Sequence, residues 1–206
     1  EIYTLSLHDA LPIWSADLSE EALGWCTYNG DHMSMYGVNC DVPKTLVRQV
    51  VRWVKDVKLS GFDEEKDFSS DNHQLASALQ SILDTPISPE LLPPSKEGEI
   101  AQITEDKVGP YELHDFFLFY AIRYGMPLDK LKMAAMQAFD GVFDEATVTK
   151  WLNVFIRRFF SQQFKRNCAP DGPKVGSVNL SQRGDWRMPA DADPALWLQE
   201  AETSEE

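Results

Sequence analysis

Residues 15–45 read SADLSEEALGWCTYNGDHMSMYGVNCDVPKT, and this run contains the most informative pattern in the chain. We expect a helix over residues 17–27, because Asp17 and Ser19 are typical N-terminal caps and two glutamates follow them. The segment 28–41 is rich in Gly, Asn and Asp, which predicts a loop. The run therefore predicts a helix, a loop and the start of a second helix.

Most of the remaining chain is predicted to be helical. Asp41 and Pro43 mark the start of a strongly amphipathic helix, in which apolar residues and a basic stripe alternate at helical spacing. Further helices are expected over residues 73–83, 111–124, 128–139 and 144–163. The helix at 111–124 is apolar on nearly every side, so we expect it to be buried. About six helices and no clear strand indicate a mostly α-helical piece of an α/β domain.

The composition excludes several classes of protein. The chain has 206 residues, of which 43% are hydrophobic, and a formal net charge of −14. This apolar content argues against disorder, and the negative charge argues against nucleic acid or an anionic membrane as the main partner. The three cysteines form no CxxC pair, which predicts reduced thiols in a cytoplasmic protein.

Hydroxyl, carboxylate and lysine side chains occur in an order that suits a nucleotide and its magnesium ion. Glu20, in a first helical turn, would either hold Mg²⁺ or simply favour the helix dipole. Lys44, near a helix start, would either bind an anion or belong to a solvated face. Ser15 and Ser88 lie in predicted loops, where a hydroxyl usually caps or bonds within a turn.

The first thirteen residues, EIYTLSLHDALPI, have neither a helical nor a strand period. They look like the in-frame translation of a common sequencing adapter, with Trp14 at the junction and the genuine frame beginning near Ser15. The alternative is an ordinary N-terminal extension. The predicted divisions are residues 1–14 as a non-native segment, 15–170 as the main domain portion and 171–206 as an irregular tail.

Seven sequence blocks in a fixed order resemble one enzyme family. They are DLSEEALGWCTY, GDHMS, VPKTL, LDTPISPELLP, DKVGPYELHDFFLFYAIRYG, FFSQQFKRNCAPDGPKV and RGDWRMP. Together they resemble the glutamine-dependent NAD synthetases. The resemblance implies an α/β fold, similar to the C-terminal half of a Rossmann-like adenine-nucleotide alpha hydrolase domain. It also implies ATP-dependent conversion of deamido-NAD to NAD, with Mg²⁺ as cofactor and ammonia from glutamine as the second substrate.

The same resemblance suggests which residues bind ligands. It implies Mg²⁺ binding by Glu20, ATP binding by Ser15, Lys44 and Ser88, and deamido-NAD binding by Tyr28, Asp31 and Lys165. It assigns no catalytic residue. It further implies a homo-oligomeric, cytoplasmic enzyme without a nucleic-acid or membrane partner.

Two features of that family do not occur in these 206 residues. They are the SGGxDS phosphate loop and the Cys-Glu-Lys machinery of a glutaminase domain. We therefore expect a C-terminal fragment of the synthetase domain that is inactive by itself. The alternative is a non-catalytic helical module for binding or oligomerisation.

Overall fold

The computed structural model describes residues 13–58, 69–87 and 107–198. Ser88 and residues 1–12 of the predicted non-native segment lie outside these ranges. The chain divides into two compact units, which are described separately. Unit 1 comprises residues 1–44 and 110–206, and unit 2 comprises residues 45–109. The predicted boundaries after residues 14 and 170 stay predictions.

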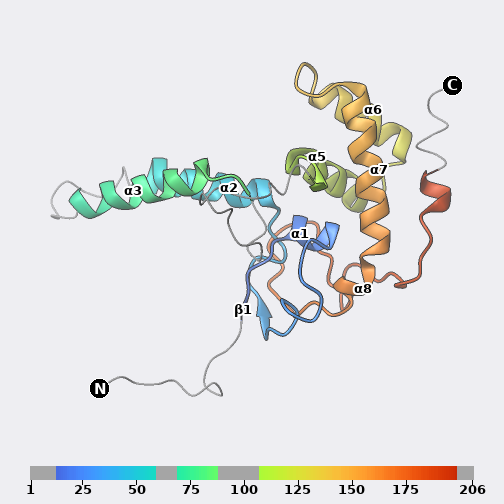
Figure 1. Ribbon diagram of the computed structural model, residues 1–206, viewed down its shortest axis with the longest axis horizontal. Helices are drawn as coiled ribbons and strands as arrows, with labels where there is room; N and C mark the ends of the chain where they lie inside the picture. Colours follow the sequence, from blue (N-terminus) through green and yellow to red (C-terminus); the bar gives the residue numbers. More distant parts are fainter. Residues whose placement is uncertain (1–12, 59–68, 88–106, 199–206) are drawn as a thin grey trace, which may run out of the picture. The chain divides into compact units, whose positions relative to one another are not determined.

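Unit 1 consists mainly of helices joined by long irregular segments (Figure 1). In chain order its elements are β1 (Ile13–Trp14), α1 (Leu18–Leu23), β2 (Tyr36–Gly37), α5 (Tyr111–Leu118), the π-helix η2 (Phe119–Arg123), α6 (Leu128–Ala138), α7 (Glu145–Ser161) and α8 (Gln163–Arg166). The two short strands pair in parallel, with Ile13 opposite Tyr36 and Trp14 opposite Gly37. The described residues are thus mostly helical, which confirms the predicted fold class, whereas the two short strands were not predicted.

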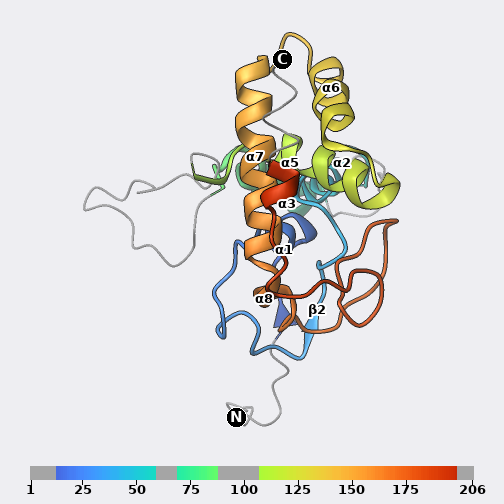
Figure 2. The ribbon, with the colours of Figure 1, turned by 90° about the vertical axis from the view of Figure 1, so that its right-hand side faces the viewer.

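Helix α7 is the structural centre of unit 1. Asp144 caps its N-terminus by accepting a 2.8 Å hydrogen bond from the Thr147 amide, and hydrogen bonding by the Thr147 side chain and then by this amide lowers the pKa of Asp144. Buried apolar residues recur along α7 at helical spacing, and they include Val148, Leu152 and Phe155. Helices α1, α5 and α6 pack against α7 (Figure 2). The sequence pattern of residues 144–163 therefore identified the main core helix correctly.

The helix predicted over residues 111–124 is only half buried. Its first part, α5, buries Tyr111, Leu113 and Phe117 against the core. Its second part, η2, has π-helical hydrogen bonding, and neighbouring aromatic side chains reach solvent: Phe119 is 38% and Tyr124 64% exposed. The expectation of complete burial was wrong for this part, because a run that is apolar on every side does not reveal which side is covered.

One buried carboxylate anchors the irregular C-terminal segment within unit 1. Asp41 accepts hydrogen bonds from the backbone amides of Val175 and Gly176, and a 3.0 Å bond from the Asn179 side chain. Leu180 beside this anchor is completely buried. Residues beyond 170 therefore contribute to the packing of unit 1 despite their lack of regular structure.

The described residues of unit 2 are mostly helical, and the first helix begins at the last residue of the preceding stretch of unit 1. Helix α2 (Lys44–Trp53) continues into the π-helix η1 (Val54–Lys58), and α3 spans Ser69–Asp84. The Arg48 guanidinium donates a 2.9 Å hydrogen bond to the Leu83 carbonyl, which joins α2 to the end of α3. Within the described ranges of the whole chain, no helix is long and apolar enough to cross a membrane.

Candidate functional site

The N-terminus of α1 is built around a reciprocal capping arrangement. Asp17 is the N-cap, and its Oδ1 accepts a 3.0 Å hydrogen bond from the Glu20 amide. The Glu20 carboxylate in turn accepts a 3.2 Å bond from the Asp17 amide. This capping box satisfies two backbone donors of a short helix and fixes both carboxylates at its first turn.

The Lys44 ammonium group lies between these two carboxylates. Its Nζ is 2.6 Å from Asp17 Oδ2 and 2.8 Å from Glu20 Oε1. The Lys44 side chain is 18% exposed and that of Glu20 19%, whereas Asp17 is buried. Among the contacts of the described residues, Lys44 uses two of its three ammonium hydrogens here. One N–H donor thus remains for an anion at the protein surface.

Burial and charge shift the pKa values of all three groups upward. Desolvation raises the pKa of Asp17, and Lys44 counteracts this effect. Desolvation and the neighbouring Asp17 raise the pKa of Glu20. Burial alone would lower the pKa of Lys44, but the two carboxylates outweigh it and the net shift is upward. The lysine is therefore held in its charged form.

Residues of α1 and α5 hold Lys44, which is the last residue of its stretch of unit 1. The Ser19 hydroxyl accepts a 2.8 Å hydrogen bond from the Lys44 backbone amide and donates to Asp115. The Lys44 ammonium also lies 5.7 Å from the centre of the Tyr111 ring, within cation–π range. The position of Lys44 is thus fixed both at its backbone and at its side chain.

The C-terminus of α1 is capped by three basic side chains from α7 and α8. Arg158 Nε donates a 2.9 Å hydrogen bond to Leu23 O, and Arg166 Nη1 donates a 2.7 Å bond to Ala22 O. Lys165 Nζ donates two bonds of 2.8 Å, to Gly24 O and to Cys26 O. Cations at the negative end of a helix are favourable, and they satisfy carbonyl groups that lack helical partners. Lys165 likewise keeps one N–H donor among its described contacts.

The loop after α1 brings an aromatic residue close to Lys165. The Tyr28 ring packs edge-on against Phe164, the residue before Lys165, with ring centres 5.2 Å apart. Asp31 accepts a 2.7 Å hydrogen bond from the Thr27 amide through its side chain. Tyr28 and Asp31 are both exposed, so their side chains face solvent beside Lys165.

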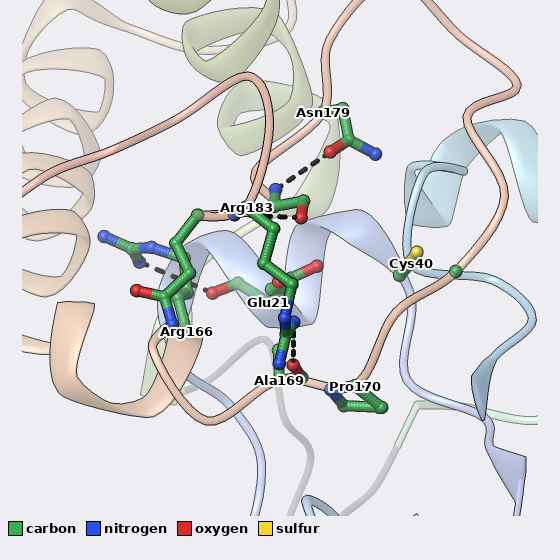
Figure 3. A pocket seen from close by; sticks show the side chains of 10 residues that line it. Glu21, Cys40, Arg166, Ala169, Pro170, Asn179 and Arg183 are labelled. Atoms are coloured by element: carbon green, nitrogen blue, oxygen red, sulfur yellow. Dashed lines mark hydrogen bonds between the residues drawn. The ribbon is translucent and has the colours of Figure 1, made fainter. Parts of the chain in front are cut away.

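A water-sized pocket of about 10 Å³ lies under α1, between Glu21, Arg166 and the C-terminal segment (Figure 3). Desolvation raises the pKa of Glu21 to about 8, although the nearby Arg166 counteracts the shift. Burial also lowers the pKa of Arg166 to about 10. The pocket is too small for a nucleotide, so it belongs to the packing of the fold.

The structure brings most of the predicted binding residues into two groups at opposite ends of α1. Glu20 and Lys44 form an ion pair at its start, and Lys165 binds the carbonyls after its end, beside the loop that contains Tyr28 and Asp31. Ser15 is exposed, and its carbonyl accepts a 3.2 Å bond from Asn39. Ser88 cannot be placed.

Sequence reasoning missed the residues that support Lys44. Asp17 and Ser19 were expected only to cap a helix, and Asp115 and Tyr111 were not singled out. Ser19 and Asp115 are separated by 96 residues, so no local pattern could have joined them.

The donor set around Glu20 suits a magnesium ion that shares its ligands with phosphate. Both Glu20 oxygens already accept one hydrogen bond, and each retains a lone pair. In the described part of the chain, no three His, Cys, Asp or Glu side chains are grouped to hold a metal. The residues therefore fit one carboxylate ligand to Mg²⁺, with phosphate and water completing the shell, and not an all-protein cage.

Sequence comparison relates the chain to one group of enzymes. It is 40% identical over 214 residues to the glutamine-dependent NAD(+) synthetase of Mycobacterium leprae, covering 95% of this chain and 30% of that protein. It is 41% identical over 203 residues to the enzyme of the same name from Mycobacterium tuberculosis H37Rv, covering 89% of this chain and 28% of that protein. The chain thus spans less than a third of the length of these relatives.

Structural comparison gives the same relationship. A glutamine-dependent NAD(+) synthetase from Cytophaga hutchinsonii matches with a TM-score of 0.66 and 18% identity, covering 96% of this chain and 27% of that chain. At this identity the match shows a shared fold, namely part of a larger α/β protein. No family model matches the sequence.

Proposed function

We propose that this chain, which is homologous over nearly its whole length to part of the glutamine-dependent NAD(+) synthetases, forms the C-terminal portion of the synthetase domain of such an enzyme. The whole enzyme would adenylate deamido-NAD with ATP and amidate it with ammonia from glutamine. The chain covers only 30% of the Mycobacterium leprae relative, and its residues contain no SGGxDS sequence. Both observations support the proposal that this chain is part of the enzyme and is inactive by itself.

The single observation that carries this proposal is the position of Lys44 between Asp17 and Glu20. Two carboxylates keep the ammonium charged, and the Lys44 side chain is 18% exposed and keeps one N–H donor beyond its described ion pairs. In the proposed enzyme this donor binds a phosphate oxygen of ATP. Glu20 then supplies an oxygen ligand to Mg²⁺, and Ser15 and Ser88 contribute hydroxyl contacts. The bound Mg²⁺ would neutralise charge that builds up on the pyrophosphate.

The second group of residues suits the other substrate. Lys165 is anchored by two backbone carbonyls and retains one N–H donor, while Tyr28 offers an exposed aromatic face nearby. An anchored cation and an exposed ring fit a dinucleotide, which carries phosphates and aromatic rings. We assign deamido-NAD to Tyr28, Asp31 and Lys165.

The proposed chemistry needs two steps, because a carboxylate is a poor electrophile. In the first step, an oxygen of the nicotinate carboxylate attacks the α-phosphorus of ATP, and pyrophosphate leaves. In the second step, ammonia attacks the acyl carbon, the bond to the phosphoryl oxygen breaks, and AMP leaves. Lys44 would bind and orient phosphate oxygens in the first step, where charge develops on the leaving group. We place the reaction in the cytoplasm, in keeping with three free thiols.

A chimaeric enzyme tests this proposal. Residues 15–198 would replace the matched segment of the Mycobacterium tuberculosis relative, and NAD formation would be measured with ammonia and with glutamine. We expect the chimaera to form NAD, and the Lys44→Met change to reduce its kcat/KM for ATP by at least about a hundredfold, the usual loss for a group aimed at developing charge.

A matched control distinguishes this effect from loss of charge alone. Lys130→Met removes an exposed lysine on α6 and should leave kcat/KM unchanged. A folded chimaera that binds neither ATP nor deamido-NAD would contradict the proposal. Calorimetric titration of the 206-residue chain with Mg²⁺ and ATP is the second test: we expect weak or no binding, and tight binding would contradict a partial site.

A helical module for self-association is the second candidate, and one feature of unit 2 favours it. Four apolar side chains of α2 and η1, spaced four, three and four residues apart, are each about half exposed: Leu46, Val50, Trp53 and Val57. This spacing is typical of helix–helix interfaces. Sedimentation measured over increasing concentration tests the idea: a Trp53→Glu change should abolish any dimer, and a monomer at all concentrations would contradict this candidate. The same surface would serve the homo-oligomer expected of the complete enzyme.

A further inference from the structure

His32 lies at the centre of the loop that follows α1. Its Nδ1 accepts a 3.2 Å hydrogen bond from the Asn29 backbone amide, and its Nε2 is 3.7 Å from the Cys26 sulfur. The rings of Trp14 and Tyr28 flank the imidazole, with centres 5.7 and 5.9 Å away. One half-buried side chain thus contacts β1 and both the start and the middle of the loop.

These contacts define the state of the imidazole. An amide N–H can only donate, so Nδ1 must carry a lone pair and the ring proton resides on Nε2, facing the Cys26 sulfur. Asn29 has a φ of +57°, a left-handed conformation that is uncommon outside glycine, although asparagine adopts it more readily than most residues. The hydrogen bond to His32 stabilises this conformation further.

We propose that neutral His32 is a positioning residue, which holds the loop 27–34 and its Tyr28 ring in place for the dinucleotide. We call the hydrogen bond between the Asn29 amide and His32 Nδ1 the lock. The identity of the ligand rests on the proposed function, whereas the lock rests on the contacts described above.

A protonated imidazole has no acceptor at Nδ1, so it would repel the Asn29 amide and loosen the loop. The loop is therefore held more tightly at neutral pH than in acid, where the bonds of Asp31 to Thr27 and Ser34 remain.

The charges that face His32 agree with this direction. Burial and the cation of Lys165 lower the pKa of His32, while Asp31 raises it, and the net shift is downward. The remaining neighbours are Cys26, whose thiol has its pKa raised to about 11 by burial, and the uncharged rings. The folded state thus binds fewer protons than the unfolded state, so stability of the loop falls as pH drops below the ordinary histidine value of 6.5.

Nuclear magnetic resonance of the 206-residue chain, without any ligand, tests the lock. A two-bond ¹⁵N correlation spectrum at pH 7.5 should show Nδ1 unprotonated and Nε2 protonated. The amide signals of residues 27–34 should shift together as His32 titrates. A proton on Nδ1 at pH 7.5, or loop amides that do not respond to the titration, would overturn the proposal.

Variants separate the hydrogen bond from ring packing. His32→Phe keeps an aromatic ring without the acceptor, and we expect Asn29 amide exchange to accelerate by about fivefold to tenfold. His32→Asn offers a carbonyl acceptor that does not titrate, so it should restore protection and remove its pH dependence. His73→Phe, an exposed change on α3, is the control. Equal exchange in the Phe variant and the parent chain would overturn the lock.

The positioning role has its own readout in the chimaera. His32→Phe should raise KM for deamido-NAD severalfold while KM for ATP and kcat remain unchanged, and His32→Asn should restore KM. An unchanged KM for deamido-NAD in an active chimaera would overturn the positioning role. An inactive chimaera would count against the proposed function, whereas the ligand-free spectra would still decide the lock.

Discussion

The Asp17 carboxylate binds Lys44 with one oxygen and caps α1 with the other. Oδ2 lies 2.6 Å from Lys44 Nζ, and Oδ1 accepts the amide hydrogen of Glu20 at 3.0 Å. One buried side chain therefore joins the first turn of α1 to the candidate phosphate-binding cation. The geometry of the site and the stability of the fold depend on the same contact.

Removal of the Lys44 charge should destabilise the protein. Lys44→Met leaves the buried Asp17 without its cation, so we expect the free energy of unfolding to fall by roughly 2–3 kcal/mol, somewhat less than for a completely buried pair because Lys44 is partly exposed. Urea unfolding at pH 7 measures this change. Lys130→Met should stay within about 0.5 kcal/mol. Similar losses in the two variants would show that Lys44 is not part of a buried ion pair.

The stability of unit 1 should decrease between pH 4.5 and pH 8 because of Glu21. Burial raises its pKa from 4.5 to about 8, so over this interval the folded state binds more protons than the unfolded state and stability is lost as pH rises. A pKa difference of one between the folded and unfolded states corresponds to about 1.4 kcal/mol. Unfolding measured across this range should show the slope, and Glu21→Gln should reduce it, leaving the part that comes from Asp17 and Glu20, whose pKa values are also raised. Glu112→Gln, a change of an exposed glutamate, is the control. If stability depended on pH equally in Glu21→Gln and in the parent chain, the assignment of this dependence to Glu21 would be wrong.

The three free thiols should react at very different rates. Cys168 is exposed, whereas burial raises the pKa values of Cys26 and Cys40 to about 11. Because the thiolate is the nucleophile, an alkylating reagent at pH 7.5 should modify Cys168 first and the other two only slowly. Mass spectrometry of peptides over time identifies the order. Rapid labelling of Cys40 would mean that the C-terminal segment does not cover it in solution.

Loss of the Asp41 carboxylate should release the C-terminal segment. Asp41→Ala leaves the amides of Val175 and Gly176 without their acceptor, so we expect their hydrogen exchange to accelerate by more than tenfold. Asp41→Asn retains one carbonyl acceptor and should show a smaller effect. Unchanged exchange in the alanine variant would mean that the segment is held by its apolar residues alone.

Local patterns predicted the helices but not their assembly. The cap at Asp17 and the apolar spacing of α7 follow from short-range chemistry and were identified correctly, whereas Asp144 was predicted only as the start of its helix and not as a cap. The three cations that cap the end of α1 come from more than 130 residues away, as for Lys165 and Gly24, which are 141 residues apart. Such contacts depend on tertiary packing, which periodicity cannot reveal.

The same limit applies to the candidate site. Lys44 and Glu20 could be proposed from helix-terminus chemistry and from the resemblance, and the structure places them in contact. The supporting roles of Ser19 and Asp115 could not be predicted from the sequence, because their side chains meet only after α1 and α5 pack together. The exposed aromatic residues around η2 were predicted to be buried. A helix that is apolar on all sides does not show which side faces the core.

The most direct test of the account is the DNA sequence upstream of the Ser15 codon. Residues 1–14 are proposed to be foreign to a gene for a glutamine-dependent NAD synthetase. We predict an open reading frame that continues upstream into an SGGxDS phosphate loop and a glutaminase domain. Genomic DNA that encodes EIYTLSLHDALPI directly behind a start codon would contradict the account, and the chain would then be a natural protein with an incomplete site.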